Sequence, residues 1–447
     1  MITRTAIYRS ICMCLLAALA AAVPSTTGCS SADGSRRNPS GSTVTLQATP
    51  YTSQIAKPTV ENLAAAFSNG GGKVPRNSAN ALVISGGGQY ASYNAGLLIG
   101  WTQAGTRPKF DVVTGISSGA LVAIYAYLGS KYDASLQKFF TTVRDKDIYT
   151  MRPVRQFFNS RSLADPKPLE DLLASQVNDE MMVDLREAHQ CGRRFYIGSM
   201  NVQTRRLTIW DVGAIASCDR PDAKELVRKV LLAASSIPGL MPSVHFDVQV
   251  NGVHYMEEHV DGGAVSQIFL RLAPGMERTD EPANWLKGSN LYALAAGKMY
   301  ADPIDANPGL IKRVTSTVSA ALYALFRAEL MGLYAFCATS GMKFHLLAIP
   351  QEVQAPANSM TFQPEEMKKL FKLGFDEACK GTKWRLTPLG TEPGEEEEPR
   401  GIAPLFPFIQ PCVGGQCLPG AGAAPALVPN PVIMPTPAIV TQPPMGN

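Results

Sequence analysis

The stretch FDVVTGISSGA, residues 110–120, places a serine between an apolar strand and a helix. Its first five residues have the apolar, β-branched composition of a buried strand, and the residues from Ala120 to Leu128 continue as an apolar helix. Ser117 therefore lies on a sharp turn between Gly115 and Gly119, and a serine held on such a turn is exposed as a nucleophile above the sheet. The alternative interpretation is a serine that caps the helix in a glycine-rich turn.

A run of three glycines follows an earlier strand. The apolar residues Ala81–Ser85 predict a buried strand, and Gly86, Gly87 and Gly88 come directly after it. Backbone N–H groups in such a loop can bind a developing negative charge, although three glycines also make a plain tight turn. A dinucleotide-binding loop is a poor match, because its spacing requires glycine where this chain has Ala91.

An aspartate followed by two glycines stands much later, in the sequence VDGG at residues 260–263. The preceding residues are extended, so Asp261 is placed at the end of a strand, where its carboxylate can accept a proton from a serine hydroxyl. Taken singly, the same residues also suit an Asp-Gly turn.

Strand and helix patterns alternate along the remainder of the folded region. A turn signal at Asn251-Gly252 predicts a hairpin over residues 246–256. The alternation of strand and helix patterns predicts an α/β fold with a mostly parallel central sheet covered by helices on both faces. The further predicted strands lie within 194–211, 291–296 and 344–349, and the further predicted helices lie at 92–101, 222–234, 316–336 and 364–379.

The composition allows one large folded domain and excludes some functions. Of 447 residues, 45% are apolar and 17% are charged, so a sizeable core can form. The net charge is only +4, with acids and bases mixed along the chain, and therefore nucleic-acid binding is not expected. No group of Cys or His has zinc spacing, and no metal or other cofactor is predicted.

The two ends of the chain have the composition of processing and tail segments. Arginines, a short apolar run and small residues at 1–28 predict a signal peptide. The sequence TTGC that ends at Cys29 is similar to a bacterial lipobox, which implies acylation of Cys29, export, and anchoring of a lipoprotein in the cell envelope; ordinary signal cleavage is the alternative. We expect a flexible tether at 29–44, the folded domain at 45–385, and a Pro/Gly-rich disordered tail at 386–447.

Six cysteines remain if the signal peptide is removed and Cys29 is acylated. An even number in an exported protein is compatible with disulfides, but their connectivity cannot be deduced from the sequence. Cys191 and Cys218 flank the strands predicted at 194–211 and are a candidate pair.

Together, the three glycine-containing motifs resemble the patatin-like phospholipase family. That family has a glycine-rich oxyanion loop after its first strand, then Gly-x-Ser-x-Gly, and later Asp-Gly-Gly; AASSIPGLMP at 233–242 is similar to the segment that precedes its aspartate. The resemblance covers residues 78–350. It implies a patatin-like fold and a serine acyl-ester hydrolase with a Ser117–Asp261 dyad, a covalent acyl-enzyme on Ser117, and a lipid or other acyl-ester substrate.

The chain departs from the family pattern at two places. Tyr90 and Ala91 stand where the family usually has a basic residue and a glycine, and this departure favours an acyl ester in general over a phospholipid in particular. Gln267 stands where an asparagine often follows the Asp-Gly-Gly motif, which we interpret as a structural exchange.

Two other functions are compatible with the sequence. An α/β-hydrolase triad needs a histidine after the aspartate, and His345 is the only one that follows Asp261; its strand-like surroundings favour a structural role. The earlier His245, His254 and His259 belong to the predicted hairpin. A non-catalytic envelope binding protein on a degenerate hydrolase fold is the second alternative, and reaction of Ser117 with a fluorophosphonate distinguishes the two classes.

Overall fold

The computed structural model describes residues 79–153, 162–250, 253–270, 286–302, 304, 309–356 and 358–388. The predicted signal peptide, the acylation site at Cys29 and the tether lie outside these residues, as does the predicted tail beyond position 388. The predictions for those segments therefore remain predictions.

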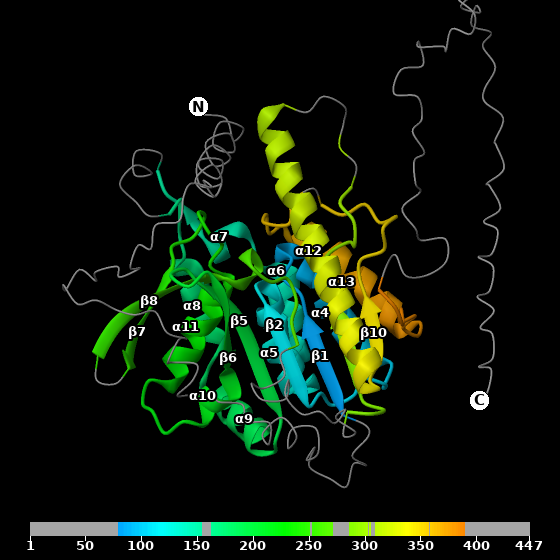
Figure 1. Ribbon diagram of the computed structural model, residues 1–447, viewed down its shortest axis with the longest axis horizontal. Helices are drawn as coiled ribbons and strands as arrows, with labels where there is room; N and C mark the ends of the chain where they lie inside the picture. Colours follow the sequence, from blue (N-terminus) through cyan, green and yellow to red (C-terminus); the bar gives the residue numbers. More distant parts are fainter. Residues whose placement is uncertain are drawn as a thin grey trace, which may run out of the picture. The chain divides into compact units, whose positions relative to one another are not determined.

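An eight-stranded sheet forms the centre of the described region, in the order β10-β9-β1-β2-β5-β8-β7, with β6 paired to β5 (Figure 1). The strands β10, β9, β1, β2 and β5 are parallel, whereas β6, β7 and β8 run antiparallel to their neighbours. The expectation of a mostly parallel sheet is thus confirmed for its centre and one side, and hairpins complete the other side. The strands are β1 Asn80–Ile84, β2 Val112–Ile116, β5 Arg194–Asn201, β6 Arg206–Asp211, β7 Val244–Val250, β8 Val253–Asp261, β9 Asn290–Leu294 and β10 Lys343–Leu347.

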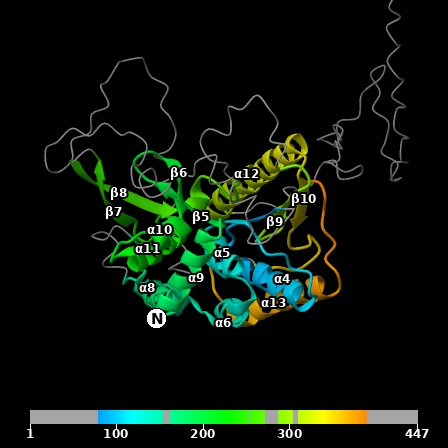
Figure 2. The same ribbon diagram turned by 90° about the horizontal axis from the view of Figure 1, so that it is seen from below.

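Helices cover both faces of the sheet, as the sequence predicts. On β1, Leu82 and Ile84 belong to one buried apolar cluster and Ala81 and Val83 to another, because alternate residues of a strand point to opposite faces. Figure 2 shows α12 on one face and α4, α5 and α13 on the other. The main helices are α4 Ala91–Gln103, α5 Ser118–Leu128, α6 Asp133–Thr142, α8 Lys167–Gln176, α9 Asp179–Gln190, α10 Val212–Ser217, α11 Ala223–Ser235, α12 Leu310–Ser340 and α13 Pro364–Cys379.

Short elements connect these layers. They are the 3-10 helices η1 Gly88–Tyr90, η2 Ser130–Tyr132 and η4 Gly262–Ala264, the helix α7 Asp145–Ile148, and a separate two-stranded sheet of β3 Thr150–Met151 and β4 Ala164–Asp165. Two of them lie at the predicted site: η1 begins at Gly88, the last residue of the glycine run, and η4 directly follows Asp261.

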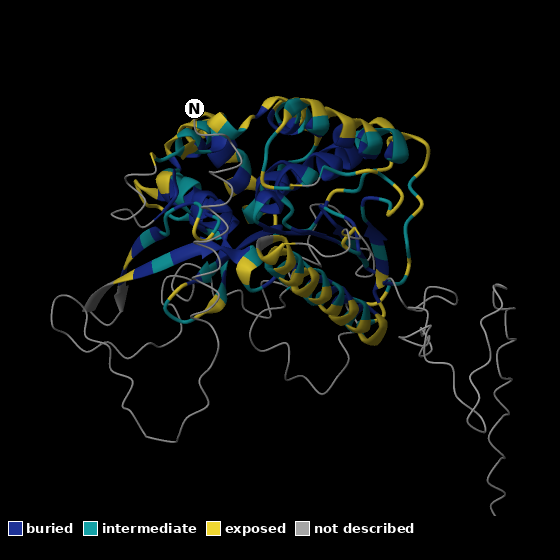
Figure 3. Cartoon of the chain, turned by 90° about the horizontal axis from the view of Figure 1, so that it is seen from above, coloured by how far each residue is buried: buried dark blue, intermediate teal, exposed yellow. Residues whose placement is uncertain are grey.

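The predicted elements are all present, with small shifts at their ends. The largest difference concerns α12, which runs from Leu310 to Ser340 rather than over residues 316–336. Its end is set by Gly341, which adopts the left-handed conformation that ends many helices. Figure 3 shows that α12 remains exposed along much of its length, while the sheet is buried.

Candidate active site

The turn that carries Ser117 connects the end of β2 directly to the start of α5. Ser117 has φ 54° and ψ −133°, a strained backbone conformation for a residue with a side chain. The turn is tight because a Cβ on Gly119 would lie 2.3 Å from the carbonyl oxygen of Ser85, a separation that only glycine tolerates. The strand–turn–helix geometry predicted around Gly115 and Gly119 is therefore present.

The strand β5 brings Ser117 and Asp261 together, although they are far apart in the sequence. Along one edge of β5, Ile116 at the end of β2 pairs with Gly198, and Asp261 at the end of β8 pairs with the next residue, Ser199. The other edge of β5 is occupied by β6. Because β2 and β8 approach from opposite directions and end at adjacent β5 residues, the residue that follows β2 meets the last residue of β8.

A short hydrogen bond joins the two side chains. The Ser117 hydroxyl donates to Oδ2 of Asp261 at 2.5 Å. The other carboxylate oxygen, Oδ1, accepts from the Gly263 N–H at 2.8 Å, and the Asp261 N–H donates to the Ser236 carbonyl at 2.8 Å. The segment at 233–242 therefore holds the backbone of Asp261, while the glycine that follows it orients the carboxylate.

Burial changes the acidity of this carboxyl group. Asp261 is only 5% exposed, and loss of hydration raises its pKa to about 6 from the ordinary value of 3.8. The hydrogen bonds from Ser117 and Gly263 act in the opposite direction and favour the ionised form. A carboxylate with this pKa is mostly ionised at neutral pH and is a stronger proton acceptor than an exposed aspartate.

The glycine run lies against the same serine. A Cβ on Gly86 would come within 2.8 Å of the Ser117 Cβ, so the close approach of the two loops requires glycine there. Within the described part of the chain, the N–H groups of Gly87 and Gly88 donate no hydrogen bond. The first turn of α5 also begins at this point, with Ser118 following the serine. The glycine run and the positive end of α5 thus both lie next to Ser117.

A carboxylate from α12 supports the loop after Asp261, and the sequence gives no local signal for it. Oε2 of Glu329 accepts hydrogen bonds from the N–H groups of Gln267 at 2.8 Å and Ile268 at 3.2 Å. The Gln267 side chain in turn donates to the Gly263 carbonyl, so the residue that replaces the family's asparagine keeps a structural role. Partial burial raises the pKa of Glu329.

A buried polar network stabilises the junction of β5 and β8. His259, which is fully buried, contacts the Ser199 hydroxyl through Nδ1 at 2.9 Å and the Glu257 carboxylate through Nε2 at 3.0 Å. The Trp210 indole donates to the same Ser199 hydroxyl at 2.8 Å. Ser199 is the ladder partner of Asp261, so this network fixes the backbone next to the site. The interpretation of His259 as a hairpin residue missed that position in the core.

The late histidine lies elsewhere in the sheet. His345 is on β10, which is separated from β2 by β9 and β1. Its Nε2 contacts Oδ1 of Asn290 at 3.2 Å, and its ring stacks on Tyr292 at 4.8 Å between centroids. Burial lowers the pKa of His345. It therefore has structural partners on the neighbouring strand and no contact with Ser117.

Two further sequence-based expectations concern cysteines and metals. Cys191 and Cys218 are free thiols in the structure, so the disulfide suggested by their spacing is absent. Both residues flank the β5–β6 hairpin in the sequence, Cys191 at the end of α9 and Cys218 at the end of α10. In the described ranges, no cluster of three or more His, Cys, Asp or Glu side chains could hold a metal ion.

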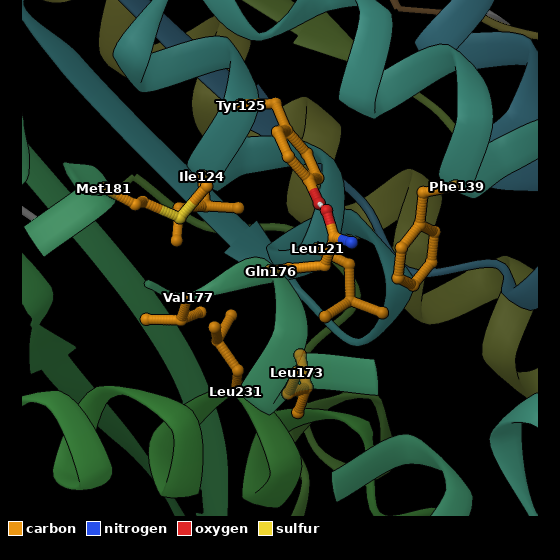
Figure 4. Close-up of a pocket in the computed structure, with 9 residues that line it drawn as sticks. All are labelled: Leu121, Ile124, Tyr125, Phe139, Leu173, Gln176, Val177, Met181 and Leu231. Atoms are coloured by element: carbon orange, nitrogen blue, oxygen red, sulfur yellow. Dashed lines mark hydrogen bonds between the residues drawn. The ribbon is translucent and has the colours of Figure 1, made fainter. Parts of the chain in front are cut away.

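A small apolar pocket lies beside α5, whose residues Leu121, Ile124 and Tyr125 form part of its lining (Figure 4). Its volume of about 10 Å³ accommodates roughly one water molecule, so an acyl chain cannot enter it without movement of the lining. The lining residues are Leu121, Ile124, Tyr125, Phe139, Leu173, Gln176, Val177, Met181 and Leu231.

Several solved structures are similar to this chain. VipD from Legionella pneumophila is 12% identical, with 68% of this chain and 66% of that chain covered and a TM-score of 0.32. Human GIVD cytosolic phospholipase A2 is 10% identical, with 75% and 63% covered and a TM-score of 0.36. ExoU, in complex with SpcU from the type III secretion system of Pseudomonas aeruginosa, is 11% identical, with 68% and 52% covered and a TM-score of 0.30. The chain spans less than two thirds of the length of each.

No curated protein sequence matches the chain. One protein-family model does match it, over residues 82–274. The family model that matches this range is that of the patatin-like phospholipases, and the range begins in β1, includes Ser117 and ends beyond Asp261. Residues 82–274 therefore form a patatin-like phospholipase domain.

Proposed function

We propose that the chain hydrolyses lipid acyl esters with Ser117 as nucleophile and Asp261 as the general base. The observation that carries this proposal is the 2.5 Å hydrogen bond from the Ser117 hydroxyl to Asp261, on a strained turn at the carboxyl edge of the parallel strands. The family assignment supports the class of reaction.

In the first half of the reaction, Asp261 takes the proton of Ser117 while Oγ attacks the ester carbonyl carbon. The resulting oxyanion is stabilised by the backbone N–H groups of Gly87 and Gly88, since that of Gly86 donates to the Gln267 carbonyl, and by those of the first turn of α5. Collapse of the tetrahedral intermediate breaks the bond to the alcohol. The alcohol leaves with the proton that Asp261 held, and the acyl group remains on Ser117.

In the second half, water replaces the alcohol. Asp261 takes a proton from this water as the hydroxide attacks the acyl carbon, and the same backbone donors stabilise the second oxyanion. Cleavage of the Ser117 ester releases the fatty acid, and Ser117 regains its proton from Asp261. The raised pKa of Asp261 suits both roles, because the group is ionised before each attack and protonated after it.

The surroundings of the glycine loop favour an acyl ester without requiring a phosphate. Tyr90 stands where the family usually has a basic residue, and its hydroxyl donates to the Pro356 carbonyl. Burial raises the pKa of Tyr90 to about 12, so the side chain stays neutral. The proposed substrate class is therefore a lipid acyl ester, with no charged headgroup contact at this position.

Three variants test the proposal on a soluble p-nitrophenyl acyl ester. Ser117→Ala and Asp261→Asn should each lower the hydrolysis rate by several orders of magnitude, because each removes one half of the proton-transfer pair. His345→Ala is the matched control and should keep its turnover per folded molecule. Loss of activity in folded His345→Ala, to the level of Ser117→Ala, would replace the dyad with a histidine triad. An inert wild-type protein would instead favour the non-catalytic binding protein.

A further inference from the structure

Helix α12 consists of two halves with different environments. Its 31 residues span roughly 46 Å, whereas the five-residue strands beside it span roughly 17 Å. The buried side chains of α12 all lie in its second half: Phe326, Leu330, Leu333 and Cys337 pack on the sheet. In the first half, residues 310–325, none of the described side chains is buried.

The first half extends past the edge of the sheet at which the active site lies. The chain turns at Gly341 from α12 into β10, so α12 runs in the opposite direction to the parallel strands. Glu329 bonds the loop that follows Asp261 and marks the point where the helix passes the site. Residues before it continue beyond the carboxyl edge of the strands, as Figure 1 shows.

The side chains of this half form an apolar face with a basic end. Val314, Val318, Ala321 and Leu325 are spaced by four, three and four residues, which places them along one side of the helix. Two large apolar side chains of this half are open to solvent, since Leu310 is 73% and Leu322 is 39% exposed.

Charges in this part of the helix have one sign. Lys312 and Arg313 are exposed at its start, and no acidic residue occurs in the helix before Glu329.

Another exposed apolar side chain lies close to the same edge of the sheet. Met360 is 40% exposed and follows Ser359, whose carbonyl accepts a hydrogen bond from the Gln89 N–H of η1.

We propose that residues 310–325 of α12 dock on an anionic lipid surface and lie in its interface, with the apolar face toward the acyl chains. An apolar face with cations at its end suits negatively charged headgroups. In length and composition, Lys312–Ser340 could cross a membrane, but its second half is packed on the sheet and Glu329 holds the site loop. The helix therefore lies on the surface and does not span it. This inference rests on the proposed function for its purpose, since docking brings lipid esters to Ser117.

The test measures binding to sucrose-loaded vesicles by sedimentation. The full chain carries Cys29→Ser, so that no covalent lipid contributes, and the vesicles contain either equimolar phosphatidylcholine and phosphatidylglycerol or phosphatidylcholine alone. We expect binding to the anionic vesicles and much weaker binding to the neutral ones. The double variant Leu310→Glu with Leu322→Glu should bind anionic vesicles at least about tenfold more weakly.

A control on the same helix carries the same charge change. Ala335 and Ala338 are exposed on the packed half, and Ala335→Glu with Ala338→Glu should bind vesicles nearly as well as the parent. Hydrolysis of soluble p-nitrophenyl butyrate should be equal in the parent and both double variants. If that ester is not hydrolysed at all, the proposed function is wrong, whereas the sedimentation result still decides the docking surface.

Three results would overturn the inference. The first is a parent protein that binds neither kind of vesicle. The second is equal loss of binding in the two double variants, which would indicate nonspecific repulsion. The third is a parent dimer in lipid-free solution that Leu310→Glu with Leu322→Glu converts to a monomer, because the apolar face would then be covered by a second copy of the chain.

Discussion

Replacing Asp261 by asparagine should make the protein more stable while it removes activity. The carboxyl group is 5% exposed, and burial raises its pKa to about 6. A folded-state pKa above the ordinary value of 3.8 means that folding favours the neutral acid, so the ionised form destabilises the folded state at neutral pH. Asparagine has nearly the same shape without the charge.

The size of this effect follows from the difference between the two pKa values. A rise from 3.8 to about 6 corresponds to about 3 kcal/mol of lost stability at pH 7, which is the most that asparagine can restore. The full loss of stability is present when the pH is above the pKa of Asp261 in the folded state. It disappears as the pH falls through 6 toward 3.8. At pH 5 the advantage of the variant should be roughly half of that at pH 7.

The assay is urea unfolding of the wild type and Asp261→Asn, followed by circular dichroism at pH 5 and pH 7. Asp171→Asn is the matched control, because Asp171 is 65% exposed and its exchange should change stability by no more than about 0.5 kcal/mol. An Asp261→Asn protein that is less stable than the wild type at pH 7 would refute the reasoning. So would an advantage that does not narrow at pH 5.

Three further predictions concern the glycine loop and the two ends of the chain. Gly86→Ala should lower the hydrolysis rate by about tenfold or more in a folded protein, because the added Cβ would displace Ser117, the proposed nucleophile. Gly332→Ala, with open space around it, is the control, and equal rates in the two variants would contradict this prediction. We predict that Cys29 is acylated, so metabolic palmitate label should disappear in Cys29→Ser, and label that persists would count against an anchor there. Truncation after Gly390 should leave the melting temperature and basic activity nearly unchanged; an insoluble product would show that the tail packs on the domain.

The parts of the fold that local patterns specify could be predicted from the sequence. Short apolar runs bounded by glycine predict β1 and β2, and the Asn251-Gly252 turn predicts the β7–β8 hairpin. The order of the strands could not be predicted, because it depends on pairings between distant residues. In particular, the approach of β2 and β8 along one edge of β5 has no local signature, although it brings the side chains of Ser117 and Asp261 together.

The candidate site likewise has parts that the sequence predicts and parts that it does not. Ser117, Asp261 and the glycine run stand in short motifs whose backbone requirements are visible in the sequence. The groups that support them are not: Glu329 is one acidic residue in a long helix, and His259 is one of several histidines in a hairpin. Their roles arise from tertiary contacts alone. The same limit applies to α12, whose length and exposed first half depend on where the sheet ends.

The most direct test of the proposed dyad is the position of a covalent adduct. The protein is incubated with a fluorophosphonate probe, and the modified peptide is identified by mass spectrometry. We predict a single adduct on Ser117 in the wild type and almost none in Asp261→Asn, because the hydroxyl attacks phosphorus only when the neighbouring carboxylate takes its proton. An active wild-type protein that is modified at another residue, or an Asp261→Asn variant that is modified as fast as the wild type, would contradict the account.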